Sequence, residues 1–183
     1  PDYNRALALL KRHAQADGFN FERLLLPSGN PMGIITFPGT DSSLPSLVLN
    51  HHMDVVPARN RSEWISDPFG AHIVNGELIG RGVQDMKGIG IVHYFALKQL
   101  KAEGYKPRRT IHVLAVPDEE VGGFKGTHEF VRSEKFKELN IGYVIDEGHA
   151  SGKLGVMDIK VSERKPIQIE VVGKGSLAHG SHL

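Results

Sequence analysis

The sequence predicts an α/β fold with a mixed, mostly parallel sheet flanked by helices. Apolar runs of strand length occur at 46–50, 110–117 and 142–148. Segments with apolar residues at helical spacing lie between them, at 86–103 and 124–139. The order strand, helix, strand, helix, strand is typical of a parallel or mixed sheet that is covered by helices.

The first part of the chain predicts a helix and two strands ahead of the main sheet. Residues 3–17 carry apolar side chains at helical spacing. FERLLLP (21–27) and MGIITFPG (32–39) are expected to form two strands around a Ser-Gly-Asn-Pro turn. A polar loop at 59–68 holds the only tryptophan, and ELIGRG (77–82) is expected to form a short strand or hairpin arm.

After residue 152 the pattern changes, which predicts a second domain. The stretch 154–175 looks like two or three long strands with little helix, and part of it alternates as half-exposed strands do. We therefore expect an α/β domain at 1–160 and the first strand of a second, antiparallel-sheet domain at 161–183.

Composition restricts the kind of site that this chain can build. The 183 residues include no cysteine, so disulfides and thiolate metal sites are excluded and any metal must be held by His, Asp and Glu. Such ligands suit Zn²⁺, Mn²⁺ or Co²⁺. The net charge is +1 and no basic run occurs, so nucleic acid is not expected as a partner. No apolar stretch approaches the roughly 20 residues of a membrane span and no secretory signal is present, which favours a cytoplasmic protein.

The first candidate site residues are His52 and Asp54 in HHMDVVP (51–57), directly after a predicted strand. Strand ends are where α/β proteins place their chemistry, and a His with a nearby carboxylate is a common metal-ligand arrangement. Taken alone, the pair fits a buried histidine satisfied by a local carboxylate better than it fits a ligand. On a strand His51 faces away from His52, so the two are not expected to bind one ion.

Asp85 lies in RGVQDMKG (81–88), just before the long predicted helix. Asp is a leading choice for a helix N-cap, and this structural role explains Asp85 about as well as a role in a site does. As a site residue, its carboxylate could bridge two cations that lie roughly 3.5–4 Å apart.

Two further acidic groups each lie at the end of a predicted strand or just beyond it, namely Asp118, Glu119 and Glu120, then Asp146 and Glu147. As solvated surface loops they would be unremarkable. However, Gly122 and Gly123 allow a tight turn that could aim two neighbouring carboxylates into one pocket. One carboxylate could then bind a metal while the other acts as a general base.

All four groups follow successive strand ends or loops of one sheet, so they are expected to converge on one edge of it. Carboxylates gathered there repel one another unless cations neutralise them. A dinuclear metal site is the economical explanation. The competing motifs HExxH, Gly-x-Ser-x-Gly, the P-loop and Gly-x-Gly-x-x-Gly are absent.

The motifs HHMDVVP, RGVQDMKG, PDEEVGG and VIDEG resemble, in order and spacing, those of the M20 metallopeptidase clan. The likeness includes PDY at the start, WxxDPF at 64–69 and SER at 162–164. Within the clan the chain is most similar to the aminoacylases, which are N-acyl-amino-acid amidohydrolases. This resemblance implies a zinc-exopeptidase-like catalytic domain at 1–160 and the start of an α+β lid or dimerisation domain at 161–183.

The resemblance also assigns roles to single residues. It implies two zinc ions per complete site, with the ligands His52, Asp85, Glu120 and Glu147. Asp85 would bridge the two ions, and in this clan the peptide bond after that residue is commonly cis. Asp54 would orient His52, Glu119 would be the general base, and Asp146 is the alternative to Glu147.

One more catalytic residue is implied by the segment LAHGS. Its His179 resembles a histidine that reaches the site of a neighbouring subunit and polarises the scissile carbonyl, although Ala178 stands where the family usually has Gly. The family's chain is much longer and supplies a last metal-binding His from its C-terminal third. Residues 1–183 are therefore expected to be a fragment.

The function implied is zinc-dependent hydrolysis of N-acyl-L-amino acids to a carboxylate and a free L-amino acid, by a homodimer joined through its lid. Two alternatives stay open. The first is an M20-type dipeptidase or exopeptidase. The second is an inactive fragment that binds metal and does not turn over.

Overall fold

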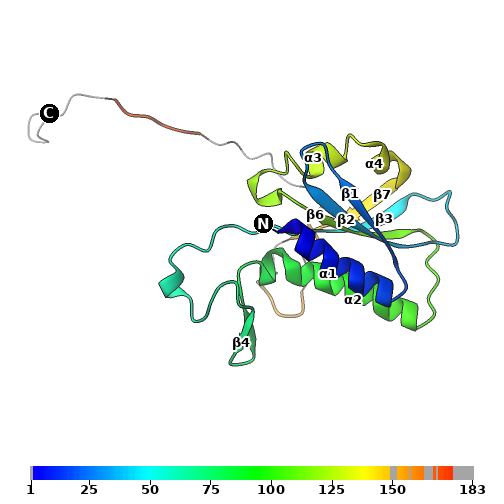
Figure 1. Ribbon diagram of the computed structural model, residues 1–183, viewed down its shortest axis with the longest axis horizontal. Helices are drawn as coiled ribbons and strands as arrows, with labels where there is room; N and C mark the ends of the chain where they lie inside the picture. The colour runs from blue at the N-terminus through cyan, green and yellow to red at the C-terminus, as the bar shows by residue number, and fades with distance from the viewer. Residues whose placement is uncertain (1, 149–151, 157, 163–166, 168, 175–183) are drawn as a thin grey trace, which may run out of the picture. The chain divides into compact units, whose positions relative to one another are not determined.

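The computed structural model describes residues 2–148, 152–156, 158–162, 167 and 169–174. The chain divides into two units, Pro1–Glu147 and Gly148–Leu183, and each is considered by itself. Every helix and strand described below lies in the first unit (Figure 1). The domain boundary expected between residues 160 and 161 stays a prediction.

The predicted N-terminal helix is confirmed as α1 (Tyr3–Ala16). Asp2 caps it, because its side chain accepts a hydrogen bond of 3.0 Å from the Arg5 N–H. The buried side chains of α1 are Leu7 and Ala14, which join two different core clusters against the sheet.

The predicted mixed sheet is confirmed, and it has five strands. They are β1 (Asn20–Leu25), β2 (Pro31–Phe37), β3 (Ser46–His52), β6 (Ile111–Val116) and β7 (Ile141–Ile145), in the spatial order β1-β2-β6-β3-β7. The pairings β1 with β2 and β2 with β6 are antiparallel, whereas β6 with β3 and β3 with β7 are parallel. The antiparallel share is therefore larger than the sequence suggested.

The three parallel strands end at the same edge of the sheet. His52 of β3 lies opposite Val116 of β6, and Leu49 of β3 lies opposite Ile145 of β7. The segments that follow these strands therefore emerge side by side, as the sequence predicted for its acidic groups.

Helices cover both faces of the sheet (Figure 1). On one face, helix α2 (Gly88–Ala102) packs Tyr94 and Leu97 with Ala14 of α1 against strand residues such as Val113. On the other face, Phe130 of the short helix α3 (Thr127–Phe130) packs against the neighbouring strand residue Leu114. The core is thus split by the sheet into two apolar layers.

The single helix predicted at 124–139 is wrong as one continuous element. The chain forms α3 and a second short helix, α4 (Glu134–Glu138). Ser133 separates them, because its backbone is extended (φ −83°, ψ 157°) and its hydroxyl accepts a 3.2 Å hydrogen bond from the Phe136 N–H. Serine competes with helix continuation in this way and starts a new helix.

Three smaller features lie between β3 and α2. The predicted hairpin is confirmed as β4 (His72–Val74) and β5 (Glu77–Ile79). A short 3-10 helix, η1 (Arg61–Glu63), lies in the polar loop before it. A π-helical turn, η2 (Val83–Lys87), precedes α2, and the expected cis peptide bond is present between Asp85 and Met86.

The strands predicted within 154–175 are not found among the described residues of that segment. Alternation in a sequence does not supply the neighbouring strand that the backbone N–H and C=O groups need as a partner. Within the described part of the chain, no helix is both long enough and apolar enough to cross a membrane.

Candidate metal centre

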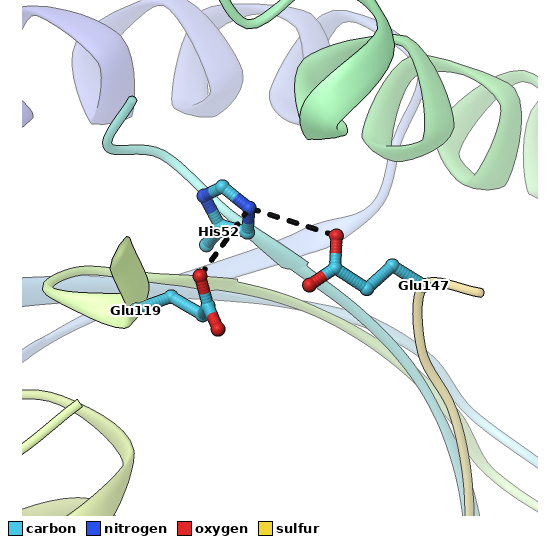
Figure 2. Close-up of side chains that lie close together, drawn as sticks. All are labelled: His52, Glu119 and Glu147. Atoms are coloured by element: carbon cyan, nitrogen blue, oxygen red, sulfur yellow. Dashed lines mark ion pairs between the residues drawn. The ribbon is translucent and has the colours of Figure 1, made fainter. Parts of the chain in front are cut away.

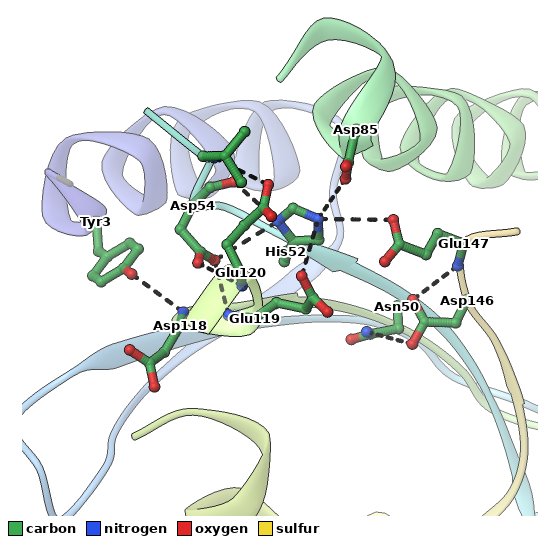
Figure 3. A network of polar contacts seen from close by, with 11 residues as sticks. Tyr3, Asn50, His52, Asp54, Asp85, Asp118, Glu119, Glu120, Asp146 and Glu147 are labelled. Atoms are coloured by element: carbon green, nitrogen blue, oxygen red, sulfur yellow. Dashed lines mark hydrogen bonds and ion pairs between the residues drawn. The ribbon is translucent and has the colours of Figure 1, made fainter. Parts of the chain in front are cut away.

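The candidate site lies at the edge of the sheet where the parallel strands end (Figure 3). His52 is the last residue of β3, and Glu119 begins the 3-10 helix η3 (Glu119–Val121) just after β6. Glu147 follows β7, and Asp85 belongs to η2. Four segments that are distant in sequence therefore meet around one histidine.

The His52 side chain is fully buried, with 0% of its surface exposed. Its Nδ1 lies 2.9 Å from the backbone carbonyl oxygen of Asp54. A carbonyl can only accept a hydrogen bond, so Nδ1 carries the hydrogen and Nε2 is the nitrogen free for other partners.

Carboxylates surround that Nε2 atom. Asp85 Oδ1 is 2.9 Å away, and one oxygen each of Glu119 and Glu147 is 3.8 Å away. Figure 2 shows Glu119 and Glu147 approaching the ring from two sides. These three carboxylates remain partly exposed, whereas the histidine is not. The site is therefore open to solvent on its acidic side.

Asp54 holds the acidic turn, which we define as Asp118, Glu119 and Glu120. Its Oδ1 accepts a 3.1 Å hydrogen bond from the Glu119 N–H, and its Oδ2 accepts one of 3.0 Å from the Glu120 N–H. The same carboxylate lies 3.7 Å from His52 Nδ1, farther than the backbone carbonyl of Asp54. The side chain thus fixes the turn directly, while the backbone oxygen orients the ring.

The charges at this edge shift the proton affinities of the site residues. Burial, together with the charges of Asp85 and Glu119, raises the pKa of Glu147 to about 7, although His52 acts to lower it. Burial also raises the pKa of Glu119. For His52, burial lowers the pKa, but the hydrogen bonds to Asp85 and to the backbone of Asp54 outweigh it, so the net pKa is raised. A bound cation would relieve this repulsion by favouring the charged carboxylates.

The donor atoms fit a metal ion. Two overlapping groups have ligand atoms within 4.8 Å of one another, His52 with Glu119 and Glu147, and His52 with Asp85 and Glu120. Imidazole nitrogen and carboxylate oxygen are the ligands that zinc and similar ions accept in proteins. The single histidine is common to both groups, so its Nε2 is the focal atom of the site.

The structure shows which of Asp146 and Glu147 faces His52, and how the neighbouring His51 is oriented. Glu147, rather than Asp146, faces His52, because Asp146 Oδ2 instead accepts a 2.9 Å hydrogen bond from Asn50 Nδ2. His51 faces the other way, as predicted. A Cβ added to Gly90 of α2 would lie 2.4 Å from the His51 ring, so glycine is required where the helix passes that ring.

The structure does not by itself establish the roles expected of three other predicted residues, Glu120, Glu119 and His179. Glu120 Oε1 accepts a 3.1 Å hydrogen bond from the Val56 N–H, which holds this carboxylate beside the chain that follows β3. Glu119, expected to be a base rather than a ligand, belongs to one of the two ligand groups. His179 lies outside the described residues.

The sequence did not point to two contacts that build the site, nor to a lysine whose charge is felt there. Tyr3 Oη accepts a hydrogen bond from the Asp118 N–H, and Asn50 holds Asp146. Burial lowers the pKa of Lys87, and the negative charge of Asp54 acts in the opposite direction with a smaller effect. Asn50 could have been noticed as the neighbour of the HHMD motif, but no pattern in the sequence links Tyr3 with residues at 118–120.

Comparison with known proteins gives a family match. The family described as peptidase family M20/M25/M40 matches residues 48–178, which include all the residues of the candidate centre. Aminoacylase-1 from Sus scrofa is 40% identical over 184 residues, and aminoacylase-1 from Homo sapiens is 38% identical over 184 residues. Each alignment covers 100% of this chain and 45% of the relative, so the chain spans about half the length of these relatives.

Solved structures show the same fold. An M20 family metallo-carboxypeptidase from Sulfolobus solfataricus has a TM-score of 0.68 at 24% identity, over 80% of this chain and 32% of its own. Human carnosine dipeptidase 1 has a TM-score of 0.63 at 22% identity, over 79% of this chain and 32% of its own. At these identities the likeness establishes the fold alone.

Proposed function

The chain belongs to peptidase family M20/M25/M40, and from that premise we propose that it carries the metal centre of an amidohydrolase that cleaves N-acyl-L-amino acids. The products would be a carboxylate and a free L-amino acid. The observation that carries the proposal is the buried His52, whose Nε2 faces Asp85, Glu119 and Glu147 at 2.9 to 3.8 Å.

In this proposal His52, Asp85, Glu120 and Glu147 hold two zinc ions. When bound, zinc lowers the pKa of water and polarises a carbonyl group. His52 suits the role of ligand because its Nδ1 is already committed to the Asp54 carbonyl, which leaves Nε2 for the ion. Asp85 suits the bridging role because its carboxylate is well exposed in front of that nitrogen.

Glu119 is proposed as the general base. It would take a proton from the attacking water and later give it to the leaving amine. Three features support this role, namely its position 3.8 Å from His52, its partly exposed carboxylate and a pKa that burial raises above the usual value. A carboxylate with a raised pKa accepts a proton from water more readily than an ordinary glutamate does.

The acylated substrate is proposed from the relatives. Relatives that match the whole chain at 37–40% identity are named aminoacylase-1, and a Danio rerio protein 38% identical over 122 residues is named N-fatty-acyl-amino acid synthase/hydrolase. Both names describe the same bond, an amide between an acyl group and an amino acid. A homodimer, a cytoplasmic location and the role of His179 in the neighbouring copy stay part of the proposal.

The proposal is tested by comparing substrates and metal states. N-acetyl-L-methionine, its D enantiomer and a methionine-containing dipeptide are offered to the zinc-loaded chain. Each assay is run with the chain alone and after adding the segment of pig aminoacylase-1 that lies beyond the aligned half. We expect hydrolysis of the L-acyl substrate, its loss with a chelator and its recovery with zinc.

Three other results would count against this proposal. Faster cleavage of the dipeptide would assign the chain to the exopeptidases instead. Equal cleavage of both enantiomers would contradict the L-specific substrate. Absence of hydrolysis under every condition, with metal bound, would support the inactive fragment.

A further inference from the structure

We propose that Tyr3, in the first turn of α1, is a positioning residue for the acidic turn (Asp118, Glu119 and Glu120). The inference rests on the proposed metal centre, because it gives Tyr3 the task of fixing two of that centre's carboxylates. Its basis is a hydrogen bond of 3.2 Å, donated by the Asp118 N–H to Tyr3 Oη (Figure 3). This contact joins residues 115 positions apart in the sequence.

The Asp118 N–H is the first of three consecutive backbone N–H groups that donate hydrogen bonds to side chains. The next two backbone N–H groups, of Glu119 and Glu120, donate to the two carboxylate oxygens of Asp54 at 3.1 and 3.0 Å. Three consecutive amides are therefore held by side chains from two other parts of the chain, α1 and the segment after β3. Ligand groups whose supporting contacts are fixed in this way keep their orientation, and loss of such contacts weakens metal binding.

The turn needs this support because of its backbone conformation. Asp118 has φ 70° and ψ 15°, in the left-handed region that L residues other than glycine seldom adopt. Such residues persist where surrounding contacts hold them in place. For Asp118 those contacts include Tyr3 at its N–H and the Lys125 N–H, which donates to Asp118 Oδ2 at 2.8 Å. A rotation at Asp118 would move both Glu119 and Glu120, because they follow it directly.

Tyr3 is itself held firmly. Its ring packs against the buried cluster of Leu7, Met53 and Ala115. Met53 stands between His52 and Asp54 in the sequence, and Ala115 belongs to the strand that leads into the acidic turn. The hydroxyl therefore has a fixed position relative to both halves of the site. Phenylalanine at position 3 would keep this packing and remove the hydroxyl alone.

The test compares Tyr3→Phe with the unaltered chain and with Tyr94→Phe. Tyr94 is a suitable control because it is a buried tyrosine of α2 whose hydroxyl also makes one hydrogen bond, to Asp17, away from the acidic turn. Exchange of the Asp118, Glu119 and Glu120 amides is measured by NMR on metal-free protein. Affinity for Co²⁺ and its visible absorption spectrum are then measured on the same samples.

We expect faster exchange at the Asp118 amide in Tyr3→Phe, about tenfold weaker Co²⁺ binding and an altered Co²⁺ spectrum. Tyr94→Phe should match the unaltered chain in all three, even where it lowers the melting temperature. Unchanged amide exchange, or unchanged Co²⁺ affinity and spectrum in Tyr3→Phe, would refute the role of Tyr3. Failure of the unaltered chain to bind Co²⁺ would instead refute the metal centre on which that role rests.

Discussion

Replacing Glu119 with Gln is expected to lower the rate of amide hydrolysis by about two to four orders of magnitude, the usual contribution of a positioned general base. Glutamine keeps the size of the side chain and its hydrogen-bonding capacity, but it cannot accept a proton from water. The Glu119 N–H would still donate to Asp54, since that contact involves the backbone. The acidic turn should therefore stay in place while the chemistry stops.

The experiment must distinguish a role of Glu119 as general base from a role as metal ligand, because Glu119 also belongs to a possible ligand group with His52 and Glu147. Zinc content is therefore measured on the sample used for the assay. Glu138→Gln serves as the matched control, since Glu138 pairs with Lys135 on α4. Loss of turnover with zinc retained supports the base. Loss of both would make Glu119 a ligand, and turnover within threefold of the unaltered protein would eliminate it as the base.

Replacing Asp54 with Asn is expected to weaken zinc binding by about 10- to 100-fold, the usual effect of removing a group that supports metal ligands. The carboxylate now accepts two N–H groups, from Glu119 and Glu120. In asparagine one of its two oxygens becomes an NH₂ group, which would face an N–H donor and repel it. The hydrogen bond from His52 Nδ1 goes to the backbone carbonyl and should survive.

This substitution therefore distinguishes two ways in which Asp54 could support zinc binding, through the acidic turn or through the His52 imidazole. Zinc affinity is measured by competition with a chromophoric chelator. Asp41→Asn is the matched control, because Asp41 also accepts a backbone N–H, from Ser43 at 3.1 Å, in an exposed turn before β3. An Asp54→Asn protein that folds and binds zinc like the Asp41→Asn control would show that the contacts to the turn have no influence on the centre.

The parts of the site that sequence could predict are those that strand order determines. Three parallel strands must end at one edge, so residues at or just beyond their ends, such as His52 and Glu119, were expected to meet, and they do. The hydrophobic pattern also predicted β3, β6 and α2, because apolar residues recur in each of them at the spacing of a strand or a helix. Spacing could not choose between Asp146 and Glu147, since that choice depends on the side chain of Asn50.

The parts that sequence missed depend on contacts between distant segments. The hydrogen bond between Tyr3 and Asp118 exists because α1 packs beside β2 and directs its first turn toward the end of β6, which no local pattern encodes. The break between α3 and α4 was also missed, because serine within an amphipathic stretch does not reveal whether its hydroxyl will cap a new helix. The strands predicted at 154–175 assumed a pairing partner that the described residues do not provide.

The measurement that tests the metal centre most directly is the zinc content of the purified chain, determined by elemental analysis beside Asp85→Ala and Asp146→Ala. Asp85 Oδ1 lies 2.9 Å from His52 Nε2, whereas Asp146 is engaged by Asn50. We predict a zinc content close to the two ions of the proposed centre in the unaltered chain and in Asp146→Ala. In Asp85→Ala we predict that the zinc is lost while the circular dichroism spectrum stays unchanged. Equal zinc in Asp85→Ala and the unaltered chain, or no zinc in any folded sample, would contradict a metal centre at His52.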